Sequence, residues 1–319
     1  NKNKTVSMKI QKLAAKEPVV SFELKPETIT DKHAVLITDK DSMLNIMSRV
    51  EEALLSGKTE GIGDCFTPDG YDMFLTLLSY GKVSLVRKPE YRFLKDGNQT
   101  LCKSIPVQFR FTTANNKDFV EDLCFRFTPE LKISSVAFTL TRQTENDILR
   151  DDKNWDESSK LLLINFLENY QTAYALKRYD YLESIFSDSA LIIVGTQLKR
   201  TAVSKDMENF VKDNILYEQK SKTEFMESLR RSFKSKNYIN LRFEDINMMK
   251  KSGQEIYGVQ VKQNYYSNNY NDVGYLTLLV DLSEELPVIH VRVWNKNKNE
   301  YLSAKTIITR PYGYQLGEW

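Results

Sequence analysis

The sequence predicts an α+β protein made of two copies of one small domain, each a curled antiparallel sheet wrapped around helices. Three observations predict this class. Two stretches of the chain resemble each other, helical periodicity precedes strand periodicity in both, and 41% of the 319 residues are hydrophobic. Helices followed by a run of strands are typical of α+β proteins. The length suits about two domains of roughly 100–200 residues each.

The strand segments carry the clearest internal similarity. Leu123–Phe138 aligns with Leu278–Val293, and each is an alternating run, a short turn and a second alternating run. Alternation with a period of two, bounded by turn residues, predicts a half-buried hairpin. A second similarity lies upstream, where Phe66 aligns with Phe186. Along the sequence, the two strand segments are further from each other than the two helical segments are. The second copy therefore has extra residues between its helices and its last hairpin, and we expect a helical insertion over about 196–235.

Helical spacing is clearest at the start of the second copy. Leu163, Leu167, Tyr170 and Tyr174 recur on one stripe of a helix, as expected for an amphipathic helix. Asn154 suits a helix start. The sequence predicts helices, in order, over 41–56, 59–66, 71–80, 156–176 and 179–186.

Strands follow the helices in both copies. The predicted strands are, in order, 84–87, 91–95, 100–112, 118–127, 132–142, 190–194, 238–248, 255–266, 273–282 and 288–295. Asp96–Gly97 and Asn115–Asn116 are hairpin signals, and Lys251–Gly253 is a turn. Strands of ten or more residues need a bend to wrap around helices.

These elements divide the chain into three parts. The parts are an N-terminal extension over 1–38 with a predicted strand at 19–24, a first copy over 39–150 and a second copy over 151–319. The stretch 143–154 is rich in Asp and Asn and is the expected boundary between the copies. The tail 306–319 is apolar and aromatic enough to dock on the protein.

The charge balance argues against a general nucleic-acid partner. The chain has 45 Lys and Arg against 43 Asp and Glu, so its formal net charge is +2, whereas nucleic-acid-binding domains are usually strongly basic. No segment approaches the roughly 20 apolar residues of a transmembrane helix. We therefore expect neither a nucleic-acid partner nor a transmembrane segment.

Metal and cofactor sites are not expected either. Cys65, Cys102 and Cys124 form no CxxC pair, and the two histidines are far apart in the sequence, whereas a structural zinc site needs about four such ligands. The apolar context of the cysteines predicts buried free thiols, with one disulfide as the alternative. The sequence contains no glycine-rich phosphate loop and no nucleophile elbow, so we expect no cofactor.

A family resemblance lies at the start of the second copy. The predicted elements follow one another in a characteristic order. The end of a long helix is followed by a small turn, then by a short helix that ends in the pattern Phe-x-Asp-x-Ala at Phe186–Ala190, and then by a strand. This order resembles the opening of the nuclear transport factor 2-like superfamily, the cone-shaped α+β fold also called cystatin-like. The resemblance covers about 155–296 without the insertion, and the first copy matches through the repeat. It implies two tandem cone-shaped domains, which we expect to pack sheet to sheet as an internal pseudo-dimer.

The resemblance implies no single function, because the family includes enzymes, transport adaptors and non-catalytic modules. Its catalytic members place an Asp, Tyr or His at the mouth of the cone, between the long helix and the concave sheet. The candidates here are Tyr170, Tyr174, Asp281, His290 and Arg292. Burial could adjust the pKa of such groups for proton transfer. The alternative, which we favour, is that the tyrosines pack in the core and that Val291 and Val293 face the cone, which places His290, Arg292 and Trp294 on the outer face.

The run Asn264–Asp272 is rich in tyrosine and asparagine. Such side chains are typical of adaptable recognition surfaces, so Tyr265, Tyr266 and Tyr270 are candidates for binding a glycan or a protein. Asn and Asp are also common turn residues. The alternative is therefore an ordinary long hairpin tip.

The sequence favours a non-enzymatic binding or scaffold protein and does not identify the ligand. One alternative is a small-molecule enzyme or carrier that uses the cone pocket of the second copy. The other is glycan or protein binding through residues 264–272. The polar start Asn1–Lys4 suits an exported, envelope-associated lipoprotein or periplasmic protein, with a cytoplasmic location as the alternative. An open cavity with converging polar groups would favour the enzyme or carrier, and cones filled by aromatic side chains would favour the scaffold.

Overall fold

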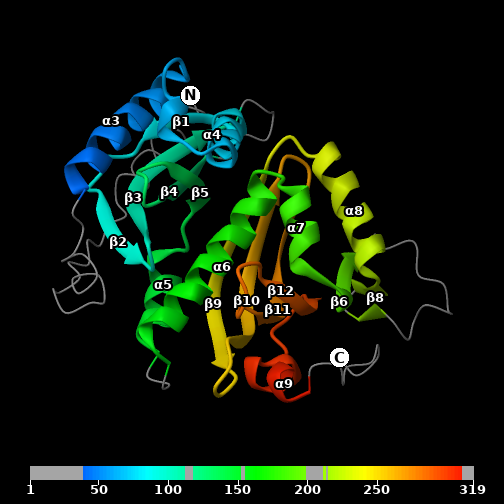
Figure 1. The fold of residues 1–319 in the computed structure, drawn as a ribbon. Helices are drawn as coiled ribbons and strands as arrows, with labels where there is room; N and C mark the ends of the chain where they lie inside the picture. Colours follow the sequence, from blue (N-terminus) through cyan, green and yellow to red (C-terminus); the bar gives the residue numbers. More distant parts are fainter. Residues whose placement is uncertain (1–38, 112–117, 152–154, 199–210, 213–214, 311–319) are drawn as a thin grey trace, which may run out of the picture. The chain divides into compact units, whose positions relative to one another are not determined.

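The α+β class is confirmed. The computed structural model describes residues 39–111, 118–151, 155–198, 211–212 and 215–310. Residues Ile37–Trp319 cluster as one compact unit, and this unit contains α-helices and two separate β-sheets (Figure 1). The predicted extension over 1–38, its strand at 19–24 and the hairpin signal Asn115–Asn116 lie outside the described residues.

The first sheet is antiparallel throughout its described strands. These are β1 (Lys82–Leu85), β2 (Arg92–Asp96), β3 (Gln99–Arg110), β4 (Phe119–Phe127) and β5 (Ile133–Phe138). They are ordered β1-β3-β4-β5, and β2 also pairs with β3. The predicted hairpin at Asp96–Gly97 is confirmed, because Asp96 pairs with Gln99 and Gly97 has a φ of +60°, which glycine adopts without strain.

Two helices pack against the first sheet, α3 (Lys40–Ser56) and α4 (Pro68–Tyr80). Thr67 begins α4, since its hydroxyl accepts the Gly70 N–H at 3.1 Å, and this side-chain cap satisfies one of the free N–H groups at the helix start. The predicted helix over 59–66 is only a 3₁₀ turn, η1 (Gly63–Cys65). The core of this part is filled by large aromatic side chains: Phe74, Phe109, Phe125, Phe127 and Phe138.

Most of the described part of the expected boundary 143–154 is helical. Residues Arg142–Leu149 form α5, which the hydroxyl of Thr141 caps by accepting the Thr144 N–H at 3.2 Å. Ile148 is fully buried, and the hydroxyl of Thr144 donates to the Phe243 carbonyl at 3.0 Å. One apolar face is enough to dock this short helix, although its segment is rich in Asp and Asn.

The second sheet is larger and mixed. Its strands are β6 (Phe186–Gln197), β7 (Val211–Lys212), β8 (Ile215–Lys220), β9 (Ile239–Lys250), β10 (Ile256–Ser267), β11 (Asn271–Asp281) and β12 (Val288–Asn295). They are ordered β7-β8-β6-β12-β11-β10-β9. The pairing of β6 with β12 is parallel, and the other pairings are antiparallel. The last hairpins are therefore as the sequence predicts.

Three helices belong to the second sheet: α6 (Glu157–Ala175), α7 (Tyr179–Ile185) and α8 (Lys222–Ser235). The carboxylate of Asp156 begins α6 by accepting the Ser159 N–H at 2.7 Å. A long helix, a short helix and a strand thus follow one another as the sequence indicates. The insertion over 196–235 was expected to be helical. In its described part it contains α8, but β8 pairs with β6 and widens the sheet, because an alternating segment takes strand form where a free sheet edge is available.

The long helix α6 also contacts the first sheet. Gln171 donates its side-chain N–H to the Phe138 carbonyl at 2.8 Å, and the hydroxyl of Thr172 accepts the Phe138 N–H at 2.8 Å. The helix is consequently buried on most of its circumference. A separate buried bond joins α4 to β9, since the hydroxyl of Tyr80 donates to the carbonyl of Ile239 at 2.8 Å.

The tail closes the opposite face of the second sheet. Residues Glu300–Leu302 form a 3₁₀ turn, η3, and Ala304–Thr309 form α9, so the described part of the tail docks as predicted. Leu302 and Ile307 share a core with Val291 and Val293. The two valines therefore face α9 and not the helices α6 and α8, and our expectation that Arg292 and Trp294 lie on the outer face was wrong.

Candidate functional site

A cavity of about 290 Å³ lies in the second sheet's part of the molecule, against α8. This volume is at the lower end of the roughly 300–1,000 Å³ typical of ligand pockets. The lining residues come from α6, α8 and the residue that follows it, four strands, and the hairpin between β10 and β11: Tyr174, Val194, Gly195, Phe225, Ser228, Leu229, Ser232, Lys236, Gln263, Tyr265, Tyr270, Asp272, Arg292 and Trp294.

Helical and strand periodicity explain how these side chains come together. Phe225, Leu229 and Ser232 are spaced along one face of α8, at intervals of four and three residues, which aligns side chains on a helix. Arg292 and Trp294 alternate with the buried valines of β12, so they share the other face of the sheet. The cavity is thus walled by a helix on one side and strands on the other.

Arg292 is the central charged group of this site. Its side chain is buried, with the residue 7% exposed, and its guanidinium carbon lies 4.8 Å from the centre of the Phe225 ring. Burial lowers the pKa of Arg292, but the hydroxyls of Tyr170 and Tyr174 raise it by more, so the guanidinium is charged at neutral pH. Its Nε and Nη1 atoms have no hydrogen-bond partner among the described residues.

Tyr170 and Tyr174 lie together, as their shared helix stripe predicts. Their hydroxyl oxygens are 3.3 Å apart, and both side chains are buried. Burial raises the pKa of Tyr174 well above its usual range, so the hydroxyl stays neutral. Tyr174 lines the cavity, whereas Tyr170 is packed beneath it against Phe243, with ring centres 6.0 Å apart.

Trp294 fits where two glycines on the neighbouring strands leave room for its ring. A Cβ atom on Gly195 of β6 would lie 2.5 Å from one edge of the indole, and a Cβ atom on Gly274 of β11 would lie 2.4 Å from the other. The ring therefore lies flat across both neighbouring strands, which any larger residue would prevent. Its Nε1 atom is buried and has no partner among the residues that the structure describes.

Asp272 is the acidic residue of the lining. Burial raises the pKa of its carboxyl group, while a hydrogen bond from Tyr270 and the charges of Lys296 and Arg292 act in the opposite direction. Its Oδ1 atom is buried and lacks a partner within the described ranges. Lys236 lies at the rim, where its ammonium is 5.6 Å from the centre of the Tyr270 ring.

Two of the predicted pocket residues are not part of the cavity. Asp281 ends β11 and accepts the Ser283 N–H at 2.9 Å, so it stabilises a turn. His290 is the extra residue of a β-bulge, because Val291 pairs with Leu279 and Ile289 pairs with Val280. A bulge interrupts the alternation of faces, and this interruption separates His290 from Arg292.

The tyrosine-rich hairpin contributes to the cavity rather than presenting a separate cluster. Tyr265 and Tyr270 line the cavity, with ring centres 6.0 Å apart. Tyr266 points to the first sheet's core, 5.5 Å from the ring centre of Phe119. Asp272 and the α8 side chains also line the cavity, although they were not among the pocket residues predicted from the sequence. The glycines at 195 and 274 were a usable signal, since they mark places where a large ring approaches the backbone.

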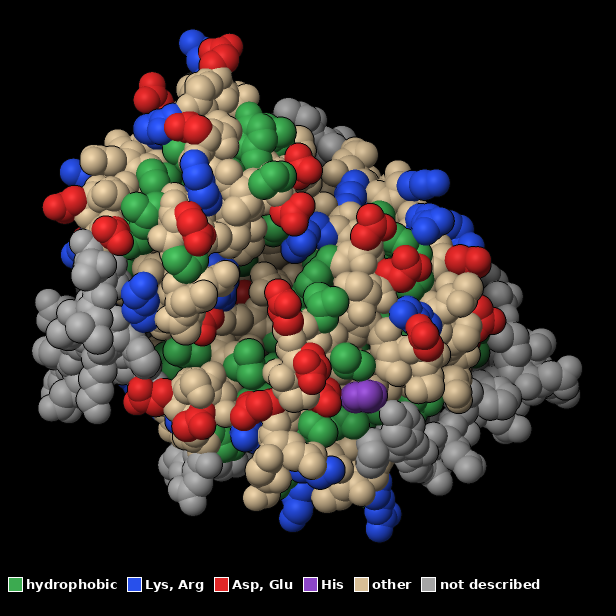
Figure 2. Space-filling model, viewed as in Figure 1, with side chains coloured by type: hydrophobic (Ala, Val, Ile, Leu, Met, Phe, Trp, Pro, Cys, Tyr) green, Lys and Arg blue, Asp and Glu red, His purple; other side chains and the backbone are tan. Residues whose placement is uncertain are grey.

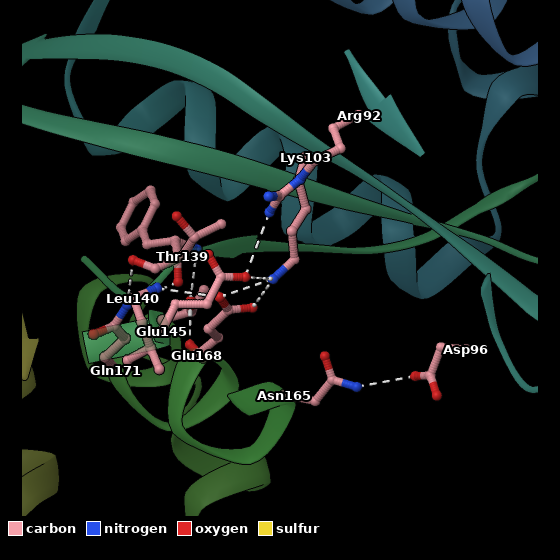
Figure 3. Close-up of polar contacts among 11 residues, drawn as sticks. Arg92, Asp96, Lys103, Thr139, Leu140, Glu145, Asn165, Glu168 and Gln171 are labelled. Carbon is pink, nitrogen blue, oxygen red and sulfur yellow. Dashed lines mark hydrogen bonds and ion pairs between the residues drawn. The ribbon is translucent and has the colours of Figure 1, made fainter. Parts of the chain in front are cut away.

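A second polar cluster lies between the two sheets, and Figure 3 shows its members pointing toward one another. The ammonium of Lys103 lies between Glu168 at 3.2 Å and Glu145 at 3.4 Å, and Arg92 is 3.4 Å from Glu145. Two cations and two anions balance in this cluster. Its charges are paired within the chain, while the Nε atom of Arg92 is buried without a partner among the described residues. Removing one partner of such a buried pair would leave the other charge uncompensated.

Neither a metal centre nor a membrane helix is found in the part of the chain that the structure describes. No three Cys, His, Asp or Glu side chains there gather as metal ligands would. None of the helices described there is long and apolar enough to span a membrane. Acidic and basic side chains are interspersed over the face shown in Figure 2.

No family model and no curated protein matches this chain. Among solved structures, the Kfla4162 protein of Kribbella flavida is 12% identical, with 46% of this chain and 95% of that chain covered and a TM-score of 0.31. The β subunit of benzoate 1,2-dioxygenase from Burkholderia mallei is 13% identical, with 44% and 91% covered and a TM-score of 0.31. Bd1075 of Bdellovibrio bacteriovorus is 10% identical, with 68% and 98% covered and a TM-score of 0.33. At these values the comparisons establish no family for the chain.

Proposed function

We propose that the chain is a non-enzymatic binding protein that holds a small organic molecule in the cavity beneath α8. The observation that carries this proposal is the set of buried, unpartnered polar atoms on Arg292, Trp294 and Asp272, all in the lining of one cavity. Buried polar groups in native proteins normally have partners. A bound ligand would supply them, and the apolar walls would receive the rest of the molecule.

The remaining part of the chain suits a supporting role. The core beside the first sheet is filled by phenylalanines, which is the arrangement expected of a scaffold. Tyr265 and Tyr270 stand in the cavity wall, and this position favours small-molecule binding over glycan or protein recognition through an exposed hairpin.

Two tandem copies of the nuclear transport factor 2-like fold are part of this proposal. Two parallel bridges support it, since Phe66 pairs with Ile133 and Phe186 pairs with Ile289. The sequence alignment matches Phe66 with Phe186, and it matches Ile133 with Val288, one residue from Ile289. The first copy then serves as a packed scaffold, and the second holds the ligand.

A screen of small organic molecules against two matched variants tests the proposal. Ser232→Phe places a ring in the cavity, whereas Ser235→Phe places the same ring on an exposed position of the same helix. We expect ligand-observed NMR to detect compounds that bind the wild type and Ser235→Phe but not Ser232→Phe. Binding that is equal in both variants, or no binding to the wild type across the library, would contradict the proposal.

A further inference from the structure

We propose that the ligand of this cavity is a small organic monoanion, with its carboxylate bound by Arg292 and its apolar body against Phe225, Leu229 and Trp294. This inference rests on the proposed function, because it names the class of molecule that the same cavity takes. It depends on three observations: the charge of Arg292, the hydrogen-bond donors without partners, and the size of the cavity.

Arg292 has no ion-pair partner in the described part of the chain, although the carboxyl group of Asp272 is close enough for the two charges to interact. None of the ion pairs among the described residues includes its guanidinium, although the side chain is buried. Arginine remains protonated in proteins, and a buried cation without a paired anion is costly. An anion that enters the cavity would remove this cost, and a neutral molecule would not.

The unpartnered atoms on Arg292 and Trp294 are all donors. Nε and Nη1 of Arg292 and Nε1 of Trp294 carry N–H groups and accept no hydrogen bond. A carboxylate offers only acceptors, and charge-assisted hydrogen bonds from a guanidinium to it are short and strong. The ligand group at this end of the cavity is therefore an acceptor with a negative charge.

The size and the remaining lining restrict the ligand to one negative charge. About 290 Å³ suits a small molecule and leaves little room for a nucleotide. Asp272 already places one carboxyl group in the lining, and this group would repel the second negative charge of a dianion. Phe225, Leu229 and Trp294 provide apolar surface for a flat or branched hydrocarbon body.

Tryptophan fluorescence can report directly on this cavity. The chain contains three tryptophans, and the double change Trp155→Phe and Trp319→Phe leaves Trp294 as the single emitter. We would titrate this variant with 3-phenylpropionate and with its neutral amide, 3-phenylpropionamide, at constant ionic strength. The two probes have the same shape and differ in charge.

We expect the carboxylate to bind at least about tenfold more tightly than the amide, and Arg292→Met to abolish that difference. Arg292→Lys, which keeps the charge but not the fork of donors, should retain part of it. Unchanged near-ultraviolet circular dichroism and melting temperature would show that these variants fold. If one of these variants fails to fold, the inference is still tested by comparing the affinities of the two probes for the single-tryptophan protein that retains Arg292.

Four results would overturn the inference, and the first three concern how the probes bind. They are equal binding of both probes, tighter binding of the amide, or carboxylate binding that survives Arg292→Met or the cavity-filling Ser232→Phe. Absence of binding by the carboxylate would also overturn it. The proposed function would stand in each case if the library screen still yields ligands excluded by Ser232→Phe, so the two proposals fail separately.

Discussion

Lys103 of β3 and Glu168 of α6 form a buried ion pair that joins the first sheet to the long helix. Their charged atoms are 3.2 Å apart, and each side chain is 3% exposed. Glu168 also accepts the Leu140 N–H at 3.1 Å. Burial lowers the pKa of Lys103, but Glu168 and Glu145 raise it by more, so the lysine stays charged at neutral pH.

Lys103→Met should destabilise the protein strongly. The change leaves Glu168 buried without its cation, and such a loss typically costs about 3–5 kcal/mol. We expect this decrease in the free energy of unfolding by urea denaturation at pH 7. Lys298→Met is the matched control, because its pair with Asp245 is about half exposed on both sides and exposed pairs contribute roughly 0–1 kcal/mol. Equal losses for the two variants would contradict this account.

Most elements of the fold could be predicted from periodicity, and α5 shows where this approach fails. Helices and long strands have patterns that extend over ten or more residues, as in α6 and β10. The helix α5 is short and contains one Asp and one Asn. Its stability comes from packing on β9 through contacts such as Thr144 with Phe243, which no local pattern reveals.

The cavity could be predicted only in part, because β12 is covered on both faces. Alternation separates Val291 and Val293 from Arg292 and Trp294, but it does not say which set faces inward. From alternation alone, we expected the valines to lie on the inner face. The tail residues Leu302 and Ile307 cover the valines instead, and this long-range contact decides the orientation.

Gly274→Ala should disturb the cavity through Trp294. The added Cβ atom would lie 2.4 Å from the indole, so the ring must shift, and forcing extra atoms into a packed site usually costs about 1–3 kcal/mol. We expect a lower melting temperature and a changed emission spectrum of Trp294 in the single-tryptophan variant. In the control Gly63→Ala the nearest atom is 3.8 Å away, and stability should change little. An unshifted spectrum for Gly274→Ala would contradict the position of the ring.

The cysteines should be unreactive in the folded protein. Cys65, Cys102 and Cys124 are buried free thiols, which confirms the sequence prediction. Burial raises the pKa of Cys124 to about 12, and the thiolate is the reactive form. At pH 8 we expect slow labelling by a thiol reagent in native buffer and rapid labelling of all three in guanidinium chloride. Fast labelling of Cys124 in native buffer would argue against its burial.

Asp272→Asn should strengthen the binding of an organic monoanion. Burial raises the pKa of Asp272, whereas Tyr270, Lys296 and Arg292 act to lower it, and Tyr265 and Lys236 are the other ionisable groups of the lining near it. When Asp272 is ionised, it repels the ligand's carboxylate. Its removal should raise the affinity for 3-phenylpropionate at pH 8 by on the order of tenfold, since nearby charges interact strongly away from bulk water.

The same repulsion gives the wild type a pH dependence of known sign. A bound anion favours protonated Asp272, so binding takes up protons, and affinity should fall as the pH rises from about 5 to 8, by less than the tenfold per unit that one full proton gives. Asp272→Asn should bind with nearly constant affinity over this range. The neutral amide should show no such trend in either protein. A pH profile that is identical in wild type and variant would assign the dependence to another group and exclude Asp272 from the binding site.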